Sequence, residues 1–378
     1  MNQISYYRGL IIVKPYGTFI KKKEKTIIVK SKLVSTIINH DLLLIEDKIG
    51  LGIIQLGKPI RINLKQFKKM YKYHLIPEKD RIEWWSRYHI LYAYPIIKNK
   101  IFKKPLLLNY SMGAQITIKP ENIIYKKILV GMSGYDYKQM YPSGINDRLT
   151  YYQNYLNSVE INMTFYRFPT EKTLLKLLKY HLCYTIKVNR YITHVKRLNE
   201  VDEYWNQFYQ SLSSLHNRII CFLFQFSSNF LYNSTNMYRL KKIIKHLNPK
   251  HRYAFEFRDS SWFNNDEVNK LFLIHNLIQV IVNVSDGWTN LSPGFNPPLN
   301  KYKPTSDMLY IRMHGTQNKY VGSYTPKELH KIFNFIAEKS VDKSLVYFNN
   351  TDHDSDAFRN AVSLKNKFND YNLNFVCK

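Results

Sequence analysis

Polar side chains gather where a buried strand should end, in the segment 159–167 with the sequence VEINMTFYR. The segment begins with apolar and β-branched residues, and it then places Glu160, Asn162 and Tyr166 close together along the chain. In an α/β protein, side chains at the ends of buried strands form the usual binding or catalytic site. A carboxylate there can bind a metal ion, transfer a proton or pair with a cation, so this segment is the first candidate for chemistry.

The elements that would position these side chains alternate between strand and helix from residue 126 onward. Strands are predicted at residues 128–134, 158–162, 184–188, 219–224, 253–257, 278–284, 308–313 and 345–348. Eight strands that alternate with helices over about 250 residues predict a (β/α)8 TIM-type barrel. A doubly wound open sheet is the alternative, but the chain has no G-x-G-x-x-G motif and no P-loop.

Polar or aromatic residues follow most of these predicted strands, and in a barrel they would meet at its C-terminal mouth. The candidates for catalysis are Glu160, Glu256, His194 and His314. The candidates for ligand binding are Tyr135, Asn162, Tyr166, Lys187, Arg190, Gln225, Arg258, Trp262, Arg312, Asn349 and Asn350. Asp352 and His353 are added as candidate metal ligands.

Three kinds of chemistry fit these residue types. In the first, a divalent metal such as zinc or manganese is held by carboxylates and histidines and assists phosphodiester hydrolysis, as in endonuclease IV-type barrels, while arginines bind the phosphate. In the second, Glu160 and Glu256 form the carboxylate pair of a metal-free acid–base enzyme that acts on a sugar or sugar phosphate. In the third, the same arginines make a non-enzymatic module that binds a nucleotide or nucleic acid. The sequence leaves all three open.

Structural roles compete with each of these functions. Glu256 with Arg258, and Glu160 with Arg167, can form fixed ion pairs that orient the loops. His194 and His314 can simply donate hydrogen bonds to backbone carbonyl groups.

The first part of the chain has a different pattern. Short β-branched segments at residues 10–13, 26–29, 42–45, 51–56 and 90–96 are separated by lysines and turn residues, which predicts a small β-rich domain over residues 1–97. One amphipathic helix is expected at residues 64–73. Residues 98–125 are expected to form a connector with one strand at 115–118, and residues 126–378 to form the barrel.

A tandem tryptophan pair lies in the segment 73–96, YHLIPEKDRIEWWSRYHILYAYPI. Together with VKSK (29–32) and IEDKIGLGIIQLGKP (45–59), this segment resembles the small ASCH/PUA-like barrels found beside nucleic-acid enzymes. The resemblance covers residues 10–97 and implies a groove that binds nucleic acid through basic and aromatic side chains. The contact residues would be Lys30, Lys32, Trp84, Trp85 and Arg87, although the tryptophans can also belong to the core.

The composition of the chain limits its expected binding partners and its cellular compartment. The formal net charge of +28 favours polyanions, and nucleic acid is therefore the expected partner. The abundance of Lys, Asn, Ile and Tyr is also what an AT-rich genome dictates, so codon usage explains the charge equally well. Three cysteines without C-x-x-C spacing fit a reducing compartment, and the apolar runs are too short to span a bilayer. We therefore expect a soluble intracellular protein that does not enter a membrane.

Several phrases of the second part resemble one known family. They are GMSGYDY (131–137), VEINMTFYR (159–167), IKVNRYITH (186–194), FEFRDSSW (255–262), YIRMHG (310–315) and YFNN (347–350). They resemble the YecE-like barrels, the seventy-second family in the series of domains of unknown function, over residues 128–368. The resemblance implies a TIM-type barrel with polar residues at the strand ends, and it implies no established reaction. Tyr135 stands where that family is expected to have Trp.

Overall fold

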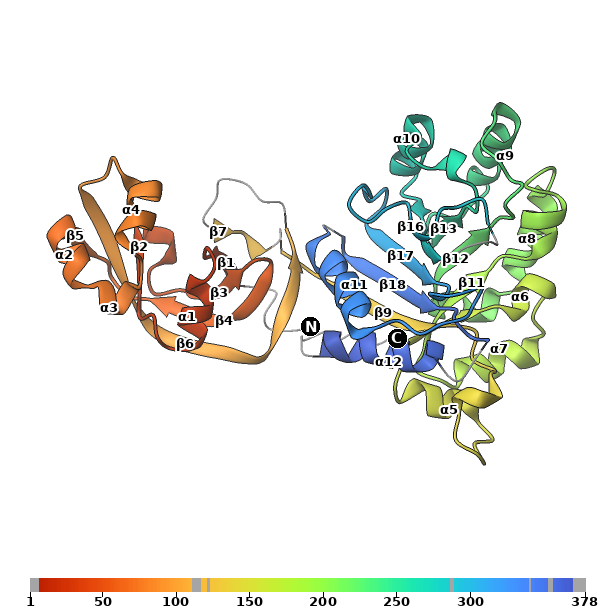
Figure 1. The fold of residues 1–378 in the computed structure, drawn as a ribbon, viewed down its shortest axis with the longest axis horizontal. Coiled ribbons are helices and arrows are strands. Elements are labelled where there is room, and N and C mark those ends of the chain that lie inside the picture. Colours follow the sequence, from red (N-terminus) through yellow and green to blue (C-terminus); the bar gives the residue numbers. More distant parts are fainter. Residues whose placement is uncertain are drawn as a thin grey trace. The chain divides into compact units, whose positions relative to one another are not determined.

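The computed structural model describes residues 7–110, 117–120, 123–285, 289–339, 341–352 and 356–369. The chain divides into two compact units, Met1–Lys126 and Lys127–Phe368, with short terminal segments assigned to each. Figure 1 labels the elements of both units.

The first unit is built on one mainly antiparallel sheet with the strand order β2-β6-β4-β3-β1-β7, while β5 and β8 also pair with β6. The strands are β1 (Arg8–Ile11), β2 (Ile27–Lys30), β3 (Asp41–Glu46), β4 (Ile49–Leu56), β5 (Ile60–Asn63), β6 (Ile90–Asn109), β7 (Thr117–Ile118) and β8 (Ile124–Tyr125). The helices are α1 (Tyr16–Lys21), α2 (Leu64–Lys69), α3 (Tyr71–His74) and α4 (Glu78–Trp85).

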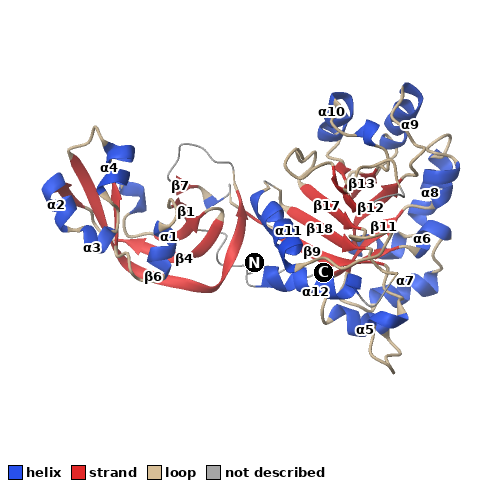
Figure 2. Cartoon of the chain, viewed as in Figure 1, coloured by secondary structure: helices blue, strands red, loops and turns tan. Residues whose placement is uncertain are grey.

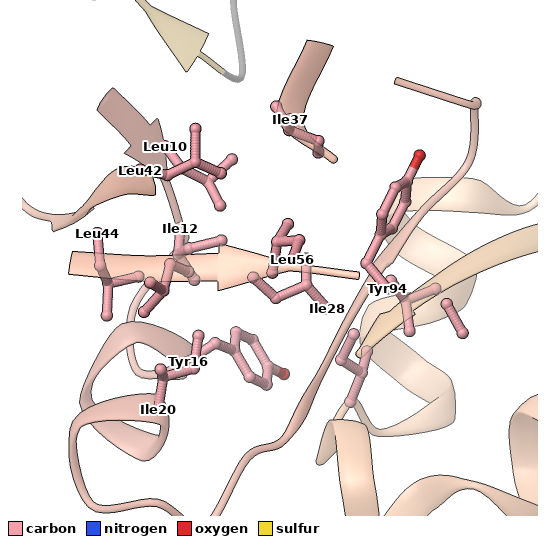
Figure 3. Packing of buried hydrophobic residues seen from close by; sticks show 14 of the residues in the cluster. Leu10, Ile12, Tyr16, Ile20, Ile28, Ile37, Leu42, Leu44, Leu56 and Tyr94 are labelled. Carbon is pink, nitrogen blue, oxygen red and sulfur yellow. The ribbon is translucent and has the colours of Figure 1, made fainter. Parts of the chain in front are cut away.

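The core of this unit joins the strands to helix α1. Leu10, Leu42, Leu44 and Leu56 from the strands pack with Tyr16 of α1 in one buried cluster, part of which is drawn in Figure 3. Burying such side chains contributes about 1.5–3 kcal/mol each relative to leaving them exposed. All five predicted strands of this part are present, and the first four lie within two residues of their expected bounds, whereas β6 continues 13 residues beyond the expected end at residue 96.

Two expectations for the first unit need correction. The predicted helix over 64–73 is broken at Met70, which ends α2 and begins α3. Residues 98–109 are not a connector, because β6 continues through them as far as Asn109. The alternation that marks a strand is hidden there by a register shift, in which Gly50 pairs with Leu106 but Gly52 pairs with Ile101.

The second unit contains a curled sheet with the order β14-β13-β12-β11-β10-β9-β18-β17-β15-β16. The pairings are parallel except for that of β15 with β16. The strands are β9 (Lys127–Ser133), β10 (Ser158–Ile161), β11 (Cys183–Lys187), β12 (Ile219–Gln225), β13 (Arg252–Glu256), β14 (Ile278–Gln279), β15 (Ile281–Val284), β16 (Gly294–Asn296), β17 (Met308–Met313) and β18 (Lys343–Phe348).

Helices lie around the outside of this sheet, as Figure 2 shows. They are α5 (Arg148–Gln153), α6 (Met163–Tyr166), α7 (Glu171–Leu178), α8 (Asp202–Gln210), α9 (Ser234–Ile244), α10 (Asp266–Ile274), α11 (Pro326–Glu338) and α12 (Asp356–Asn369). Sequence signals placed the starts of two of them correctly. Thr170 caps α7, and Thr325 and Glu328 form a capping box at the start of α11 with Pro326 in its first turn.

The inner face of the curled sheet is filled by apolar residues from many strands. Leu129, Leu223, Ala254, Tyr310 and Tyr347 belong to one buried cluster although they come from five different strands. Side chains alternate between the two faces of a strand, so residues two positions later must point to the same inner face. Among the described residues, no helix is long and apolar enough to cross a membrane.

Candidate functional site

The polar residues predicted from the sequence lie one step beyond this apolar layer, at the carboxyl ends of the strands. Glu256 follows Ala254 by two residues, Arg312 follows Tyr310, and Asn349 follows Tyr347. Glu160 and Lys187 also point to the inner face. Each follows by two residues a side chain on that face, Ser158 or Thr185, and both of these hydrogen-bond to the hydroxyl of Tyr347. The alternation therefore directs the side chains from several strands into one polar cluster.

Arg312 is the centre of this cluster and is 1% exposed. Its Nη1 donates to Oε2 of Glu256 at 2.6 Å, and its Nη2 donates to Oε1 of Glu160 at 2.6 Å. The same Nη2 lies 2.8 Å from Oγ of Ser133. One guanidinium group therefore bridges the two carboxylates that were predicted to be catalytic, which come from β10 and β13.

Glu256 has a second cationic partner. The guanidinium group of Arg258 donates to Oε1 of Glu256, and its Nη2 lies 3.4 Å from Nε2 of His314. Nδ1 of His314 lies 3.1 Å from Nδ2 of Asn349. The ion pair between Glu256 and Arg258, considered above as a structural alternative, is present in the structure. The backbone N–H of His314 donates to the carbonyl of Asn283 at 3.0 Å, so both the ring and the backbone of this histidine are held by hydrogen bonds.

Glu160 is held by hydroxyl groups as well as by Arg312. Tyr310 donates to its Oε2 at 2.6 Å, and Ser133 donates to its Oε1. Arg167, the partner expected from the sequence, is exposed and lies on a neighbouring pocket instead. Tyr310 and Ser133 were not predicted as site residues. Both could have been found from the two-residue spacing, because Ser133 ends β9 and Tyr310 precedes Arg312 on β17 by two residues.

Burial and the arginines together set the ionisation of these groups. Burial raises the pKa of Glu256, but Arg258 and Arg312 outweigh it and hold that pKa below its usual range. Burial, with the charges of Arg258 and Arg312, lowers the pKa of His314 well below 6.5. Glu256 is therefore a carboxylate at neutral pH, and His314 is a neutral imidazole.

Lys187 is the cation of the cluster that has no carboxylate partner in contact. Its side chain is half-buried, and its Nζ lies 4.3 Å from the centre of the Phe165 ring. Within the described part of the chain, its ammonium group makes no hydrogen bond and no ion pair. Burial and the charge of Arg312 lower its pKa from 10.5 to about 7, against the weaker opposite effect of the two glutamates.

His194 also contacts the Phe165 ring, in an edge-to-face arrangement. The two ring centres are 5.0 Å apart, and Nδ1 of His194 lies 2.9 Å from Oγ1 of Thr193. Burial and the charge of Lys187 lower the pKa of His194 to about 4, so its ring is neutral at physiological pH.

A pocket of about 530 Å³ lies beside the cluster, over the ends of β9 and β10. Its lining includes the predicted ligand-binding residues Tyr135 and Asn162, together with Tyr137. Asn162 donates to Oγ of Ser133 at 3.0 Å, and Tyr137 donates to the Ser133 carbonyl at 2.7 Å. Ser133 therefore connects the pocket to Glu160 and Arg312.

Other predicted residues lie at the same edge without joining the buried cluster through a described contact. Tyr166 is 70% exposed and packs edge-on against Phe165. Arg190 and Asp352 are exposed, and Gln225 is half-buried with its Nε2 directed at a backbone carbonyl. Asn350 is buried and holds the loop at Gly322 and helix α12 through its Nδ2. His353 lies outside the described residues.

Trp262, predicted from the sequence to bind a ligand, is instead part of the core. Its side chain is fully buried, and its ring stacks on Phe257 and Phe230 at 4.2 and 5.3 Å between ring centres. Its Nε1 donates to the carbonyl of Phe230. Because neighbouring aromatic rings already cover its surface, Trp262 is a core residue that anchors the loop after β13.

The donors of the cluster do not fit a zinc or manganese ion. Within the residues described, no three His, Cys, Asp or Glu side chains are grouped so that they could hold a metal ion. Arg312 and Arg258 already occupy the carboxylate oxygens of Glu160 and Glu256. A metal ion at this place would have to displace a guanidinium group that carries the same sign of charge.

A second candidate site lies in the first unit. A pocket of about 410 Å³ is lined by four of the five residues predicted to bind nucleic acid, Lys30, Lys32, Trp84 and Trp85. The fifth, Arg87, is exposed and is not part of the lining. Both tryptophans are half-buried, and they reach the pocket from the end of α4, which the sequence did not predict as a helix.

Aromatic contacts and lysines with lowered pKa values distinguish this pocket. The rings of Trp84 and Trp85 meet edge to face at 5.8 Å, and Tyr16 meets Trp84 at 5.7 Å. Burial lowers the pKa of Lys30 to about 8 and that of Lys25, another lining residue, to about 7. The pocket therefore combines aromatic surfaces with amines that gain charge when an anion approaches.

Comparison with known proteins identifies the family of the second unit. The family model described as "Protein of unknown function DUF72" matches residues 129–375, which is most of the chain. The chain belongs to the DUF72 family. The resemblance of the sequence phrases to YecE-like proteins is thereby confirmed.

Solved DUF72 structures have the same fold as the second unit. A DUF72 family protein from Thermotoga maritima is 24% identical, with a TM-score of 0.56, and covers 64% of this chain and 99% of its own. One from Enterococcus faecalis is 21% identical, with a TM-score of 0.55, and covers 64% of this chain and 95% of its own. At these identities the likeness establishes the fold, and the DUF72 description supplies no reaction.

Comparison with ASCH proteins gives a weaker result. An ASCH protein from Zymomonas mobilis is 10% identical, with a TM-score of 0.24, and covers 27% of this chain and 73% of its own. That TM-score carries no argument, so the ASCH-like assignment of residues 10–97 stays a prediction. None of the curated proteins compared with the chain matches it.

Proposed function

We propose that the DUF72 unit binds the phosphate group of a nucleic-acid-like ligand at the carboxyl ends of its strands. We also propose that these strands close into a complete (β/α)8 barrel, since only Val280 separates β14, which pairs with β13, from β15, which pairs with β17. The proposed site is the C-terminal mouth of that barrel, where enzymes of this fold place their active sites.

The charge balance of the buried cluster is the observation that supports phosphate binding. Arg258 and Arg312 form ion pairs with the two carboxylates, and both histidines are neutral. Lys187 is therefore the cation of the cluster whose charge no carboxylate contact balances. Burial and the charge of Arg312 lower its pKa to about 7, so its positive charge is only partly developed at neutral pH. A phosphate group that approaches Lys187 would restore its proton and gain a charge-assisted hydrogen bond.

Proton uptake makes this proposal testable. At pH 8, binding of a 5′-phosphorylated oligonucleotide should take up part of one proton, because the phosphate raises the pKa of Lys187 from about 7. Isothermal titration calorimetry in buffers of different ionisation enthalpy measures that uptake. Lys187→Met should weaken binding about 10-fold or more and abolish the uptake.

The matched control is Lys179→Met, which removes an exposed lysine that follows helix α7. It should leave both affinity and proton uptake unchanged. Equal binding of the oligonucleotide with and without its 5′-phosphate would contradict the proposal. Equal affinity of the Lys187 variant and the unaltered protein would contradict it too.

We propose that the first unit contributes a second contact, in which an unpaired base enters the pocket of Trp84 and Trp85. The supporting observation is that the aromatic rings and the amines of Lys25 and Lys30 line one cavity of about 410 Å³. Stacking of a base on an aromatic side chain is worth about 1–3 kcal/mol. Trp85→Ala should therefore weaken binding of single-stranded RNA by about 5-fold or more, by fluorescence anisotropy.

The matched control for this pocket is Tyr73→Ala, which removes an aromatic ring that is 43% exposed on the same unit and does not line the pocket. An equal loss of affinity in both variants would assign the effect to general aromatic content rather than to the pocket. The affinity of the Trp85→Ala variant for RNA should depend on salt as strongly as that of the unaltered protein, because a stacked ring makes no contact with phosphate.

Neither of the first two chemistries considered from the sequence is part of this proposal. The donor set gives no support to metal-assisted phosphodiester hydrolysis. A glycosidase-like role for Glu160 and Glu256 requires one of them to donate a proton, and Arg312 binds both while the pKa of Glu256 is lowered. Both carboxylates instead hold the arginines in place.

A further inference from the structure

The pocket of about 530 Å³ over the ends of β9 and β10 gathers cations that no carboxylate holds. Its lining includes Arg167, which follows α6, and Lys172 and Lys176 of α7. All three side chains are exposed, and within the residues that the structure describes none of them forms an ion pair or a side-chain hydrogen bond. Their charges are therefore available to a ligand in this pocket.

The acidic residue of the lining does not offset these three cations. Asp136 pairs with Arg148, which is not a lining residue, and the Asp136 side chain is 76% exposed. Lys172 and Lys176 lie about one turn apart on α7, and like charges at that spacing destabilise a helix slightly. The stability of α7 therefore gives no reason for this arrangement, whereas an anion bound between the two ammonium groups would remove their repulsion.

Two tyrosines from the loop after β9 line the same pocket. The hydroxyl of Tyr137 donates to the carbonyl of Ser133 at 2.7 Å, so this side chain is held in place. Tyr135 is half-buried, and in the described part of the chain its ring contacts no other aromatic ring. Tyr135 therefore supplies the pocket with an aromatic surface that no neighbouring ring covers.

We propose that this pocket is a nucleotide-binding subsite, in which the phosphate of one nucleoside phosphate lies against the three cations and its base lies against Tyr135. An arginine can bind two phosphate oxygens at once, and a lysine adds a point charge. Bases of any identity stack on aromatic rings. The inference goes beyond the proposed function, because it uses neither Lys187 nor the tryptophan pocket of the first unit.

Two double variants of the full-length protein with equal changes of charge test the phosphate contact. Lys172→Gln with Lys176→Gln removes two cations of the pocket, and Lys179→Gln with Lys245→Gln removes two exposed lysines outside its lining. The probe is a fluorescent single-stranded RNA with a 5′-hydroxyl end, which lacks the terminal phosphate that the Lys187 site requires.

Fluorescence anisotropy should show that the pocket variant loses about 10-fold in affinity for this RNA, against less than about 2-fold for the control. The slope of log K against log salt concentration should also become shallower in the pocket variant than in the control, because a phosphate contact is lost. Equal losses of affinity in the two double variants would overturn the phosphate contact and the inference with it.

Substitutions of Tyr135 test the base contact. Tyr135→Ala removes the ring and should weaken binding of the same RNA by about 5-fold or more, whereas Tyr135→Phe keeps the ring and should bind like the unaltered protein. Both variants keep the backbone carbonyl of Tyr135, which accepts a hydrogen bond from the hydroxyl of Tyr141. An equal loss in both variants, or no loss in either, would overturn the assignment of a base to this pocket.

Competition on the unaltered protein distinguishes a free nucleotide from a nucleotide within a strand. Displacement of the RNA by AMP at a concentration about 5-fold or more below that needed for ribose 5-phosphate assigns the pocket to free nucleotides. RNA binding that needs the pocket lysines but resists AMP assigns it to a strand. Equal displacement by both compounds overturns the base contact, and this arm remains decisive if a variant fails to fold. The proposed function fails separately, because the Lys187 variant is tested with a 5′-phosphorylated oligonucleotide.

Discussion

Removal of the guanidinium group of Arg312 tests the central claim about the cluster most directly. The change is Arg312→Met, which keeps a long side chain but leaves two buried carboxylates without their shared partner. Arg312 makes hydrogen bonds of 2.6 Å to both Glu160 and Glu256 and is 1% exposed. Breaking a buried ion pair from one side costs about 3–5 kcal/mol, because the charge left behind is buried and uncompensated.

Removal of Arg312 should destabilise the protein more through Glu160 than through Glu256. Glu256 keeps its contact with Arg258, so it retains one cation. Glu160 keeps only hydroxyl partners, Tyr310 and Ser133. Most of the loss should therefore come from Glu160, and the double variant Arg312→Met with Glu160→Gln should regain about 1–3 kcal/mol of it.

The pH dependence has a defined sign. In the unaltered protein the pKa of Glu256 is lowered, so its stabilisation is present above the unfolded pKa of about 4.3 and is lost as the pH falls through the folded value. The variant lacks the part of this stabilisation that Arg312 supplies, so the difference in stability between the two proteins should shrink as the pH falls below about 4, through the folded pKa of Glu256.

Hydrogen exchange read by mass spectrometry in increasing urea measures this loss in the second unit alone, through peptides of β10 and β13. The control is Arg359→Met, whose guanidinium group pairs with Asp356 and is 62% exposed, so its removal should cost about 0.5 kcal/mol or less. A loss below about 1 kcal/mol for the Arg312 variant, or a loss that is independent of pH, would refute the reasoning.

Three further predictions use the same unfolding measurement. Tyr310→Phe removes the hydroxyl that Glu160 accepts and should cost about 1–3 kcal/mol, while the exposed Tyr238→Phe should cost nothing. Trp262→Ala should cost about 3–5 kcal/mol and leave phosphate affinity intact; a selective loss of affinity would restore its ligand role. The folded pKa of His194 is about 4 against about 6.5 unfolded, so the unfolded state binds its proton first and stability falls between pH 6.5 and 4. His194→Gln should reduce that fall, and an unchanged pH profile would contradict the value.

The strands of the second unit could be predicted because their sequence signal is strong. Buried parallel strands are continuous apolar runs, such as Ile219–Phe224, and polar residues follow them at once. Each strand predicted for this unit is found within two residues of its expected bounds, although Val280 divides the sixth into β14 and β15. The short antiparallel strand β16 was missed, since three residues in a loop rich in Pro and Asn carry no periodic pattern.

The contacts inside the cluster could not be predicted in the same way. The sequence placed Glu160, Glu256 and Arg312 at one edge, but it could not assign partners, and it offered Glu160 an ion pair with Arg167, five positions past the predicted strand end at residue 162. The true partner, Arg312, is 152 residues away along the chain. Trp262 was misassigned for a related reason, because a tryptophan after a strand looks the same whether it faces the mouth or Phe257.

An ion-pair cluster of this kind is not what holds the sheet of the DUF72 unit together. The layer beneath it is apolar and comes from many of the same strands, including Leu129, Ala254 and Tyr310. Replacing buried ion pairs by apolar residues is often neutral or stabilising, so packing alone gives no reason to bury Glu160, Glu256 and Arg312. Their position at the carboxyl ends of the strands suits a role in setting charge states, because the arginines keep Glu256 ionised, while burial together with the charges of Arg312 and Arg258 lowers the pKa of Lys187.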